Sequence, residues 1–290
     1  MVPTRRRGAP AVLVEHAGEL ILIDCGEGTQ RQMNVAGKSR ARIRKILLTH
    51  WHGDHVGGLA PLLQTMFNGP FDGTLELWGP LGTRQRLEHL SCAMEIALDR
   101  IQVCELEPPP DAVEVFFTNE SYQLSCAAMR HGVLTVAYSI NTHARRRIDT
   151  ESAAALGLGR GPLMGQLQRG EAVQLNGRLI RPEEVTYWQP GKKFAVVTDT
   201  TPTPEIAELA RGADVLLCES TYSSQHEDLA SAYNHMTALQ VGALAREAGV
   251  RQLVLTHFSQ RYDDVRPLLE EARSVFPETI AAEDFLSLQI

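Results

Sequence analysis

The sequence has 290 residues, of which 43% are hydrophobic and 22% charged, and a formal net charge of −7. This composition is typical of a soluble globular chain, and no apolar run is long enough for a transmembrane helix. The basic opening MVPTRRR is followed by too short an apolar stretch for a secretory signal, so we expect a cytoplasmic protein. The pI near 5.8 predicts that nucleic acid is repelled unless basic residues gather locally. Five cysteines without a C-x-x-C pair disfavour a disulfide framework and a cysteine-rich zinc site.

Six short apolar runs each end in a polar side chain that can bind a metal or a proton. Runs rich in Ile, Leu and Val suit strands that are buried on both faces. In chain order the runs are ELILIDCG with Asp24, RKILLTH with His50, QLSCAAMRH with His131, KFAVVTDT with Asp199, ADVLLCES with Glu219 and RQLVLTH with His257. The pattern TALQVGALAREAGV predicts a helix over 237–248 with Gly249 as its C-cap.

Strands covered by helices predict an α/β layered architecture, in which functional residues gather at one edge of the sheets. RKILLTH and RQLVLTH lie about two hundred residues apart and share the ending Leu-Thr-His. The match is too short to prove a duplication. It fits two similar half-sheets that bring their strand ends to one place.

The segment LLTHWHGDHVGGL places His50, His52, Asp54 and His55 within six positions at a predicted strand end. His50 and His52 are two apart and point to the same side in extended backbone, while Gly53 lets the chain turn toward Asp54 and His55. Imidazole nitrogens and carboxylate oxygens are the usual ligands of Zn²⁺. Without a cation, four such groups would repel or desolvate one another, so we expect a metal site here.

Three further side chains, His131, Asp199 and His257, bring the candidate ligands to seven. This number is too large for one ion and suits two ions bridged by a carboxylate, here Asp199. For each of the three taken singly, a solvated turn residue or a hydrogen-bonded core group remains the competing interpretation.

The histidine segment resembles the corresponding motif of the metallo-β-lactamase superfamily. Further stretches together resemble the ribonuclease Z family over nearly the whole chain: VPTRRRGAP, DCGEGTQRQM, GPLG, GRGPLMGQLQRGE, VVTDT, CESTY, NHMTA and LTHFSQRY. The resemblance implies a four-layered αββα sandwich with a protruding basic arm, formed by one domain, residues 1–290, with the arm inserted within 141–193. It also implies a zinc-dependent endoribonuclease that removes the 3′ trailer of precursor tRNA, leaving a 3′-hydroxyl on the tRNA and a 5′-phosphate on the trailer.

By the same resemblance, one of two zinc ions per subunit, or Mn²⁺ in its place, would be bound by His50, His52 and His131. The other would be bound by Asp54, His55 and His257, with Asp199 bridging. Asp54 matches the general base. Glu219 matches a carboxylate that orients His235, which protonates the departing 3′-oxygen or stabilises the transition state. The family also implies a homodimer.

Two of these regions keep a structural alternative. From the residues alone, YNHMTALQ, which contains His235, fits the polar start of a helix as well as it fits a functional histidine. DCGEGTQ, which contains Asp24, suits a strand-to-helix turn, and its two glycines make no dinucleotide fingerprint, so we expect no nucleotide cofactor.

Residues 141–193 carry nine basic and five acidic side chains, an excess of four positive charges. A basic extension can bind the phosphates of tRNA without reading sequence. The candidate tRNA-binding residues are Arg145, Arg146, Arg147, Arg160 and Arg169. On composition alone, an ordinary solvated loop is an equal alternative.

The sequence departs from the family pattern at two places. It opens at MVPT without the strand and turn that the family has before this proline, so the first strand is absent or the start is misassigned. Asn234 and Met236 flank His235 where the family has Gly and Ser.

The alternative function is a small-molecule hydrolase of the same superfamily, acting on a phosphodiester, sulfate ester, lactone or thioester. Such an enzyme needs the metal ligands but neither the Glu219–His235 pair nor the arm.

Overall fold

The computed structural model describes residues 2–290, and the chain divides into two compact units. The main unit comprises Met1–Thr118, Leu124–Ile140 and Lys193–Ile290. The small unit comprises Asn119–Gln123 and Asn141–Lys192. Within the described residues, no helix has the length and apolar character needed to cross a membrane.

The first sheet has five strands in the order β1-β2-β3-β4-β5. The pair β1–β2 is antiparallel and the other pairs are parallel. β1 forms one edge, and residues 2–11 before it contain no strand. The bounds are β1 Val12–His16, β2 Glu19–Ile23, β3 Ile43–Leu47, β4 Leu75–Pro80 and β5 Ile101–Leu106.

The second sheet has seven strands in the order β16-β15-β14-β13-β8-β7-β6, and its pairs from β13 to β16 are parallel. Each of the six apolar runs contributes a strand, as predicted, and the polar residue lies at or just beyond its carboxyl end. The bounds are β6 Val113–Thr118, β7 Tyr122–Met129, β8 Thr135–Thr142, β13 Lys193–Val197, β14 Val215–Glu219, β15 Gln252–Thr256 and β16 Thr279–Ala281.

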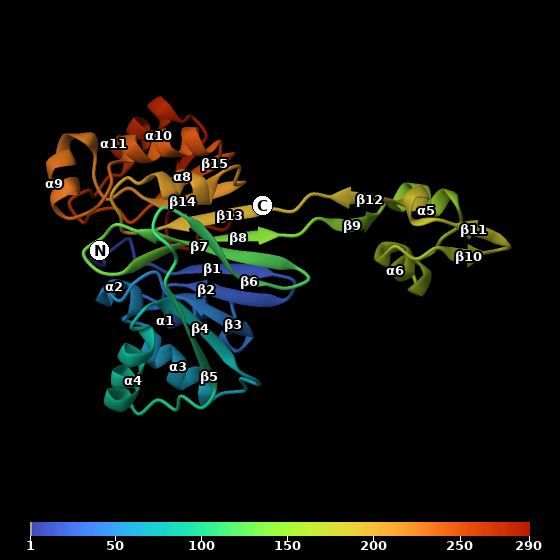
Figure 1. Ribbon diagram of the computed structural model, residues 1–290, viewed down its shortest axis with the longest axis horizontal. Helices are drawn as coiled ribbons and strands as arrows, with labels where there is room; N and C mark the ends of the chain where they lie inside the picture. The colour runs from blue at the N-terminus through green and yellow to red at the C-terminus, as the bar shows by residue number, and fades with distance from the viewer. Residues whose placement is uncertain (1) are drawn as a thin grey trace. The chain divides into compact units, whose positions relative to one another are not determined.

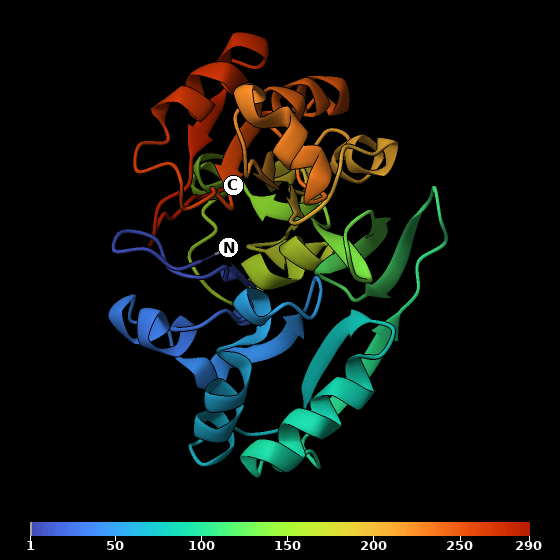
Figure 2. The ribbon, with the colours of Figure 1, turned by 90° about the vertical axis from the view of Figure 1, so that its left-hand side faces the viewer.

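Helices cover the outer face of each sheet, which gives the main unit its αββα layers (Figures 1 and 2). The helices on the first sheet are α1 Thr29–Val35, α3 Leu59–Phe67 and α4 Thr83–Met94, and those on the second are α8 Pro204–Ala210, α10 Ala238–Ala248 and α11 Arg266–Val275. The predicted helix is α10, which Thr237 caps through Gln240 and which ends at Gly249 with φ of 63°. Shorter helices are η1 Arg40–Arg42, α2 Gly53–Val56, η2 Ser224–His226 and α9 Glu227–Ala232.

The two sheets are joined directly beneath the histidine segment. The hydroxyl of Tyr138, on β8, donates a hydrogen bond of 2.6 Å to the carbonyl of Leu48. The backbone N–H of Val136 donates to the carbonyl of Thr49 at 2.9 Å. These bonds tie the end of β3 to the second sheet, so ligands from both sheets have a common frame.

The small unit has a hydrophobic core of its own, so the alternative of an ordinary solvated loop is wrong. Its core contains Ala153, Leu158, Leu167, Val173, Ile180 and Val185. Its elements are β9 Arg145–Ile148 paired with β12 Thr186–Gln189, β10 Val173–Leu175 paired with β11 Arg178–Ile180, and the helices α5 Thr150–Ala155, α6 Pro162–Arg169 and α7 Pro182–Val185. The glycines of GLGRGPLMG separate α5 from α6, which begins at Pro162.

Candidate metal centre

The histidine segment leaves β3 and enters the short helix α2, with His52 as its N-cap residue in extended backbone. The chain turns at Gly53, where extended backbone gives way to the helix, but Gly53 has no left-handed backbone, so this turn does not require a glycine. The close approach occurs elsewhere. A Cβ on Gly58 would overlap the carbonyl oxygen of Gly26, and the N–H of Gly58 donates to the carbonyl of Cys25 at 2.8 Å. The DCGEGTQ turn therefore locks the histidine segment in place.

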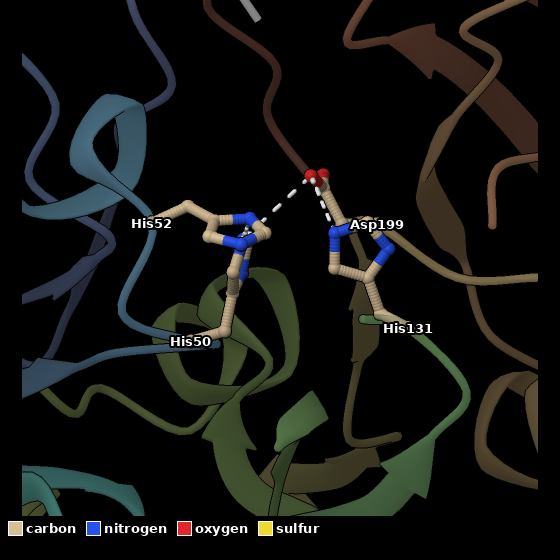
Figure 3. Close-up of side chains that lie close together, drawn as sticks. All are labelled: His50, His52, His131 and Asp199. Atoms are coloured by element: carbon tan, nitrogen blue, oxygen red, sulfur yellow. Dashed lines mark hydrogen bonds and ion pairs between the residues drawn. The ribbon is translucent and has the colours of Figure 1, made fainter. Parts of the chain in front are cut away.

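The first ligand group joins side chains from three strand ends: His50, His52, His131 and Asp199 (Figure 3). One ligand atom from each lies within 4.8 Å of those of the others. Oδ2 of Asp199 is 3.7 Å from Nε2 of His50 and 3.8 Å from Nε2 of His131.

The second ligand group contains Asp54, His55 and His257. Oδ2 of Asp54 is 3.5 Å from Nε2 of His55 and 3.6 Å from Nε2 of His257. The other oxygen of Asp199, Oδ1, is 3.5 Å from Nε2 of His55 and 3.1 Å from Nε2 of His257. Asp199 thus presents one oxygen to each group, which is the arrangement of a bridging carboxylate.

The distances and the unpaired atoms both fit bound cations. Two ligand atoms of a tetrahedral ion are about 3.3–3.6 Å apart when each is about 2.0–2.2 Å from it. Nε2 of His55, Nε2 of His257 and Oδ1 of Asp199 are buried, and within residues 2–290 they have no hydrogen-bond partner. Buried polar atoms are rarely left unpaired, so the convergence of these three atoms fits a site that binds a cation.

The ionisation of the histidines agrees with this interpretation. Burial, together with the neighbouring ring of His55, lowers the pKa of His50 to about 2, so its imidazole stays neutral as a metal ligand must. Burial also opposes charge on His55, but Asp24 and Asp199 outweigh it and raise the pKa of His55 to about 9. The carboxylates therefore favour a positive charge at this point.

Asp24 supports the centre through hydrogen bonds, a role that its place in a strand-to-helix turn did not reveal. Its carboxylate accepts a hydrogen bond from Nδ1 of His55 at 2.7 Å and from the N–H of Thr49 at 2.8 Å. The hydroxyl of Thr49 lies 2.9 Å from the same carboxylate and 3.1 Å from Nδ1 of His50. Such contacts fix the ring orientation and leave Nε2 for the metal.

Glu219 and His235 form an equivalent pair on the other side. Nδ1 of His235 is 2.9 Å from Oε1 of Glu219, which is fully buried and also accepts from the N–H of Thr200 at 2.7 Å. The Thr221 hydroxyl donates to Glu219 at 2.6 Å and lies 3.1 Å from Nδ1 of His257. Burial lowers the pKa of His235, but Glu219 outweighs it and raises that pKa overall. Each side of the centre, one at Asp24 and the other at Glu219, therefore has a carboxylate, a threonine hydroxyl and two histidines.

The unusual residues beside His235 have structural reasons. Asn234 has φ of 56°, a left-handed conformation that glycine adopts freely and asparagine tolerates better than most residues. Its carbonyl is 3.0 Å from Nδ1 of His131 and thereby orients that ring. Met236 is fully buried in the core beneath α10. Both variants are compatible with the site.

The roles of the two threonines and of the backbone carbonyl of Asn234 were not predicted from the sequence. Thr49 and Thr221 each stand next to a site residue, in LLTH and CEST, and this adjacency is the only signal that the sequence offers. Their roles depend on carboxylates that reach them across neighbouring strands.

The small unit neutralises part of its basic excess internally. Arg146 pairs with Glu183 at 3.2 Å, Arg169 with Glu171 at 2.9 Å and Arg178 with Glu184 at 2.7 Å. Arg145 and Arg147 instead contact the neutral side chain of Gln189. Arg160 is exposed and has no polar partner in the described chain. Arg145, Arg147 and Arg160 therefore remain open to an external phosphate.

Comparison with known proteins identifies the family. Models of the metallo-beta-lactamase superfamily and of a beta-lactamase superfamily domain match residues 4–71 and 184–258. Ribonuclease Z of Methanosarcina acetivorans is 40% identical, over 100% of this chain and 94% of its own, and that of Methanosarcina mazei is 38% identical over the same shares. The crystal structure of human tRNase Z, short form, matches with a TM-score of 0.72 and 25% identity, covering 100% of this chain and 96% of that one. The chain belongs to the ribonuclease Z family of the metallo-β-lactamase superfamily.

Proposed function

We propose that the protein is a metal-dependent endoribonuclease that removes the 3′ trailer of precursor tRNA. Cleavage leaves a 3′-hydroxyl on the tRNA and a 5′-phosphate on the trailer. Membership in the ribonuclease Z family supports this reaction, and so do the groups of histidines and aspartates that could hold metal ions.

Two Zn²⁺ ions per subunit, or Mn²⁺ in their place, are the proposed cofactors. His50, His52 and His131 would hold one, Asp54, His55 and His257 would hold the other, and Asp199 would serve both. Bound in this way, divalent ions polarise phosphoryl oxygens and lower the pKa of water toward neutrality. Asp54 is at the same time the proposed general base, because its carboxylate faces the interior of the centre beside His55 and His257.

His235 is the proposed proton donor to the departing 3′-oxygen. Glu219 holds its Nδ1, so the tautomer and orientation are fixed and Nε2 is left for the substrate. The ring centroid of His235 lies 5.1 Å from that of His131 and 5.4 Å from that of His257, so the donor borders both ligand groups. A general acid in this position contributes about 10²- to 10⁴-fold to the rate.

The small unit is the proposed tRNA-binding arm. Arg145 and Arg147 lie on one face of the β9–β12 ribbon, together with Tyr187, because residues two apart in a strand share a face. Arg160 adds a third open cation. Arg146 stacks on Trp188 at 5.0 Å and, like Arg169, has a carboxylate partner, so these two rank lower among the proposed phosphate contacts.

A cytoplasmic homodimer is the proposed working form. Precursor tRNA is the partner, and no membrane or nucleotide cofactor is required. Light scattering on the purified protein tests the dimer: a mass near twice 32.0 kDa supports it, and a monomer contradicts it.

The observation that carries the proposal is the Glu219–His235 pair beside a complete ligand set. The ligand set alone would serve hydrolysis in general, and the buried carboxylate adds an oriented proton donor, which suits a poor leaving group such as the 3′-oxygen of tRNA. The test incubates purified protein with Zn²⁺ or Mn²⁺ and a trailer-bearing precursor tRNA, and maps both product ends, with lactone and thioester substrates in parallel. Cleavage just after the discriminator nucleotide supports the proposal. Rapid lactone or thioester turnover with intact precursor overturns it.

A further inference from the structure

Two tyrosines and an arginine gather beside the Glu219–His235 pair, and neither the metal centre nor the small unit uses them. Tyr222 is buried, with its ring centroid 6.2 Å from that of His235. Tyr233 stands two residues before His235, and the guanidinium of Arg261 lies 5.4 Å from the ring centroid of Tyr222. All of these residues belong to the main unit.

Tyr233 presents its ring to solvent at a rigid point of the backbone. The side chain is 61% exposed, and within residues 2–290 its hydroxyl has no hydrogen-bond partner. Its N–H donates to the carbonyl of Leu229 at 3.0 Å at the end of α9. The next residue, Asn234, makes the left-handed turn whose carbonyl orients His131. The exposed ring is thus anchored at the rim of the candidate metal centre.

Arg261 offers a positive charge at the same rim. The residue is exposed, and no carboxylate of the described chain lies within ion-pair distance of its guanidinium. Burial raises the pKa of the Tyr222 phenol, and the nearby Tyr233 hydroxyl adds to this rise while Arg261 opposes it. Arg261 therefore lies beside the ring of Tyr222, which in turn neighbours the ring of His235, two positions after Tyr233. By contrast, Arg266, which is also exposed, is neutralised by Asp264 at 2.6 Å.

An exposed aromatic ring beside a guanidinium that has no carboxylate partner suits the binding of one single-stranded nucleotide. Aromatic rings stack on bases of any identity, and arginine pairs with phosphate. Stacking recognition is typical of unpaired RNA ends, whose bases are free to leave the helical stack. A lone exposed tyrosine would need no explanation. Here it coincides with an open cation and a proton donor.

We propose that Tyr233 and Arg261 bind the last nucleotide that the tRNA retains, with its base against Tyr233 and its 5′ phosphate against Arg261. The inference rests on the proposed function. His235 donates its proton to the departing 3′-oxygen, and that oxygen belongs to the retained nucleotide. Side chains that adjoin His235 therefore face this nucleotide and not the trailer. The pair fixes where the cut falls.

The first measurement compares the binding of two trailer-free tRNAs, one ending at the discriminator nucleotide and one shorter by that nucleotide. Wild-type protein should bind the longer tRNA about 5- to 100-fold more tightly, as expected for one stacked base. Tyr233→Ala should abolish this difference, whereas Tyr233→Phe, which keeps the ring, should retain it. Equal binding of both tRNAs by the wild type, or an unchanged preference in Tyr233→Ala, overturns the inference.

The second measurement follows precursor cleavage. Tyr233→Ala and Arg261→Ala should raise KM about 5- to 100-fold and spread the cut over neighbouring positions. Arg266→Ala is the matched control and should change neither, because its guanidinium is already paired. Hydrolysis of a small phosphodiester should be unchanged in all three variants, which shows that the centre is intact. If wild-type protein cleaves no precursor at all, the proposed function fails. If it cleaves and both rim variants keep the wild-type cut and KM, only this inference fails.

Discussion

Replacing Asp24 with Asn should weaken metal binding although Asp24 is not a proposed ligand. The carboxylate accepts from Nδ1 of His55 through one oxygen and from the N–H of Thr49 through the other. Asparagine has the same shape as aspartate, but an NH₂ group, which donates hydrogen bonds, replaces one of the two acceptor oxygens. Whichever way the amide turns, a buried N–H of His55 or of Thr49 faces another donor.

The structure sets the expected size of the effect. Asp24 is 2% exposed and His55 fully buried, so water cannot replace the lost bond. Loss of such an outer partner of a metal-binding histidine typically lowers metal affinity about 10- to 100-fold. That range corresponds to about 1.4–2.8 kcal/mol of binding free energy. Asp24→Asn should lie within it, and Asp24→Ala, which loses every acceptor, at its upper end.

Competition with a chromophoric zinc chelator measures the affinity directly, without reference to activity. Asp264→Asn serves as the control, because Asp264 is exposed and pairs with Arg266 at the surface. Thermal melting of the metal-free proteins shows whether the variants fold. A folded Asp24→Asn protein that binds zinc as tightly as the wild type would refute the supporting role of Asp24.

Three further predictions concern the proposed acid, the metals and the arm. His235→Ala should retain the bound zinc but lose about 10²- to 10⁴-fold in kcat on precursor tRNA; metal analysis showing loss of zinc would refute the role of a proton donor. Chelation should lower the melting temperature, since a ligand held at 100 times its Kd stabilises the folded state by about 2.7 kcal/mol; an unchanged melting curve would contradict a buried metal centre. Replacing both Arg145 and Arg147 with Ala should weaken tRNA binding and reduce the slope of log K against log salt by about 1–2, with Arg178→Ala as control because Arg178 is paired with Glu184.

The six principal strands were predictable because burial on both faces restricts their composition. β2, β3, β14 and β15 are rich in Ile, Leu and Val, and most side chains of all six strands, β7 and β13 included, are buried. The polar side chain that follows each strand stands out in the sequence against these apolar residues. The same reasoning found α10, whose cap and closing glycine are both visible in the sequence.

The small unit could not be predicted in the same way. Its helices have six, eight and four residues, and its strands three or four, so no periodic pattern extends far enough to be recognised. Its core side chains, such as Leu167, Val173 and Ile180, are scattered among glycines and charges. The segment folds because these few side chains pack together, and this packing depends on the tertiary structure and not on a local sequence pattern.

The candidate metal ligands stand out in the sequence, whereas the residues that orient them do not, and the reason is physical. A metal restricts its ligands to a few residue types, so histidines and aspartates at strand ends stand out wherever they occur. A supporting hydroxyl or carboxylate is restricted only by its position. Asp24 reaches Thr49 because β2 and β3 are parallel and in register, with Ile23 opposite Leu47. Glu219 is likewise brought beside the His257 loop because it lies opposite Thr256 in the parallel pair β14–β15. Since strand register is set by packing over the whole sheet, these supports become visible only once the fold is known.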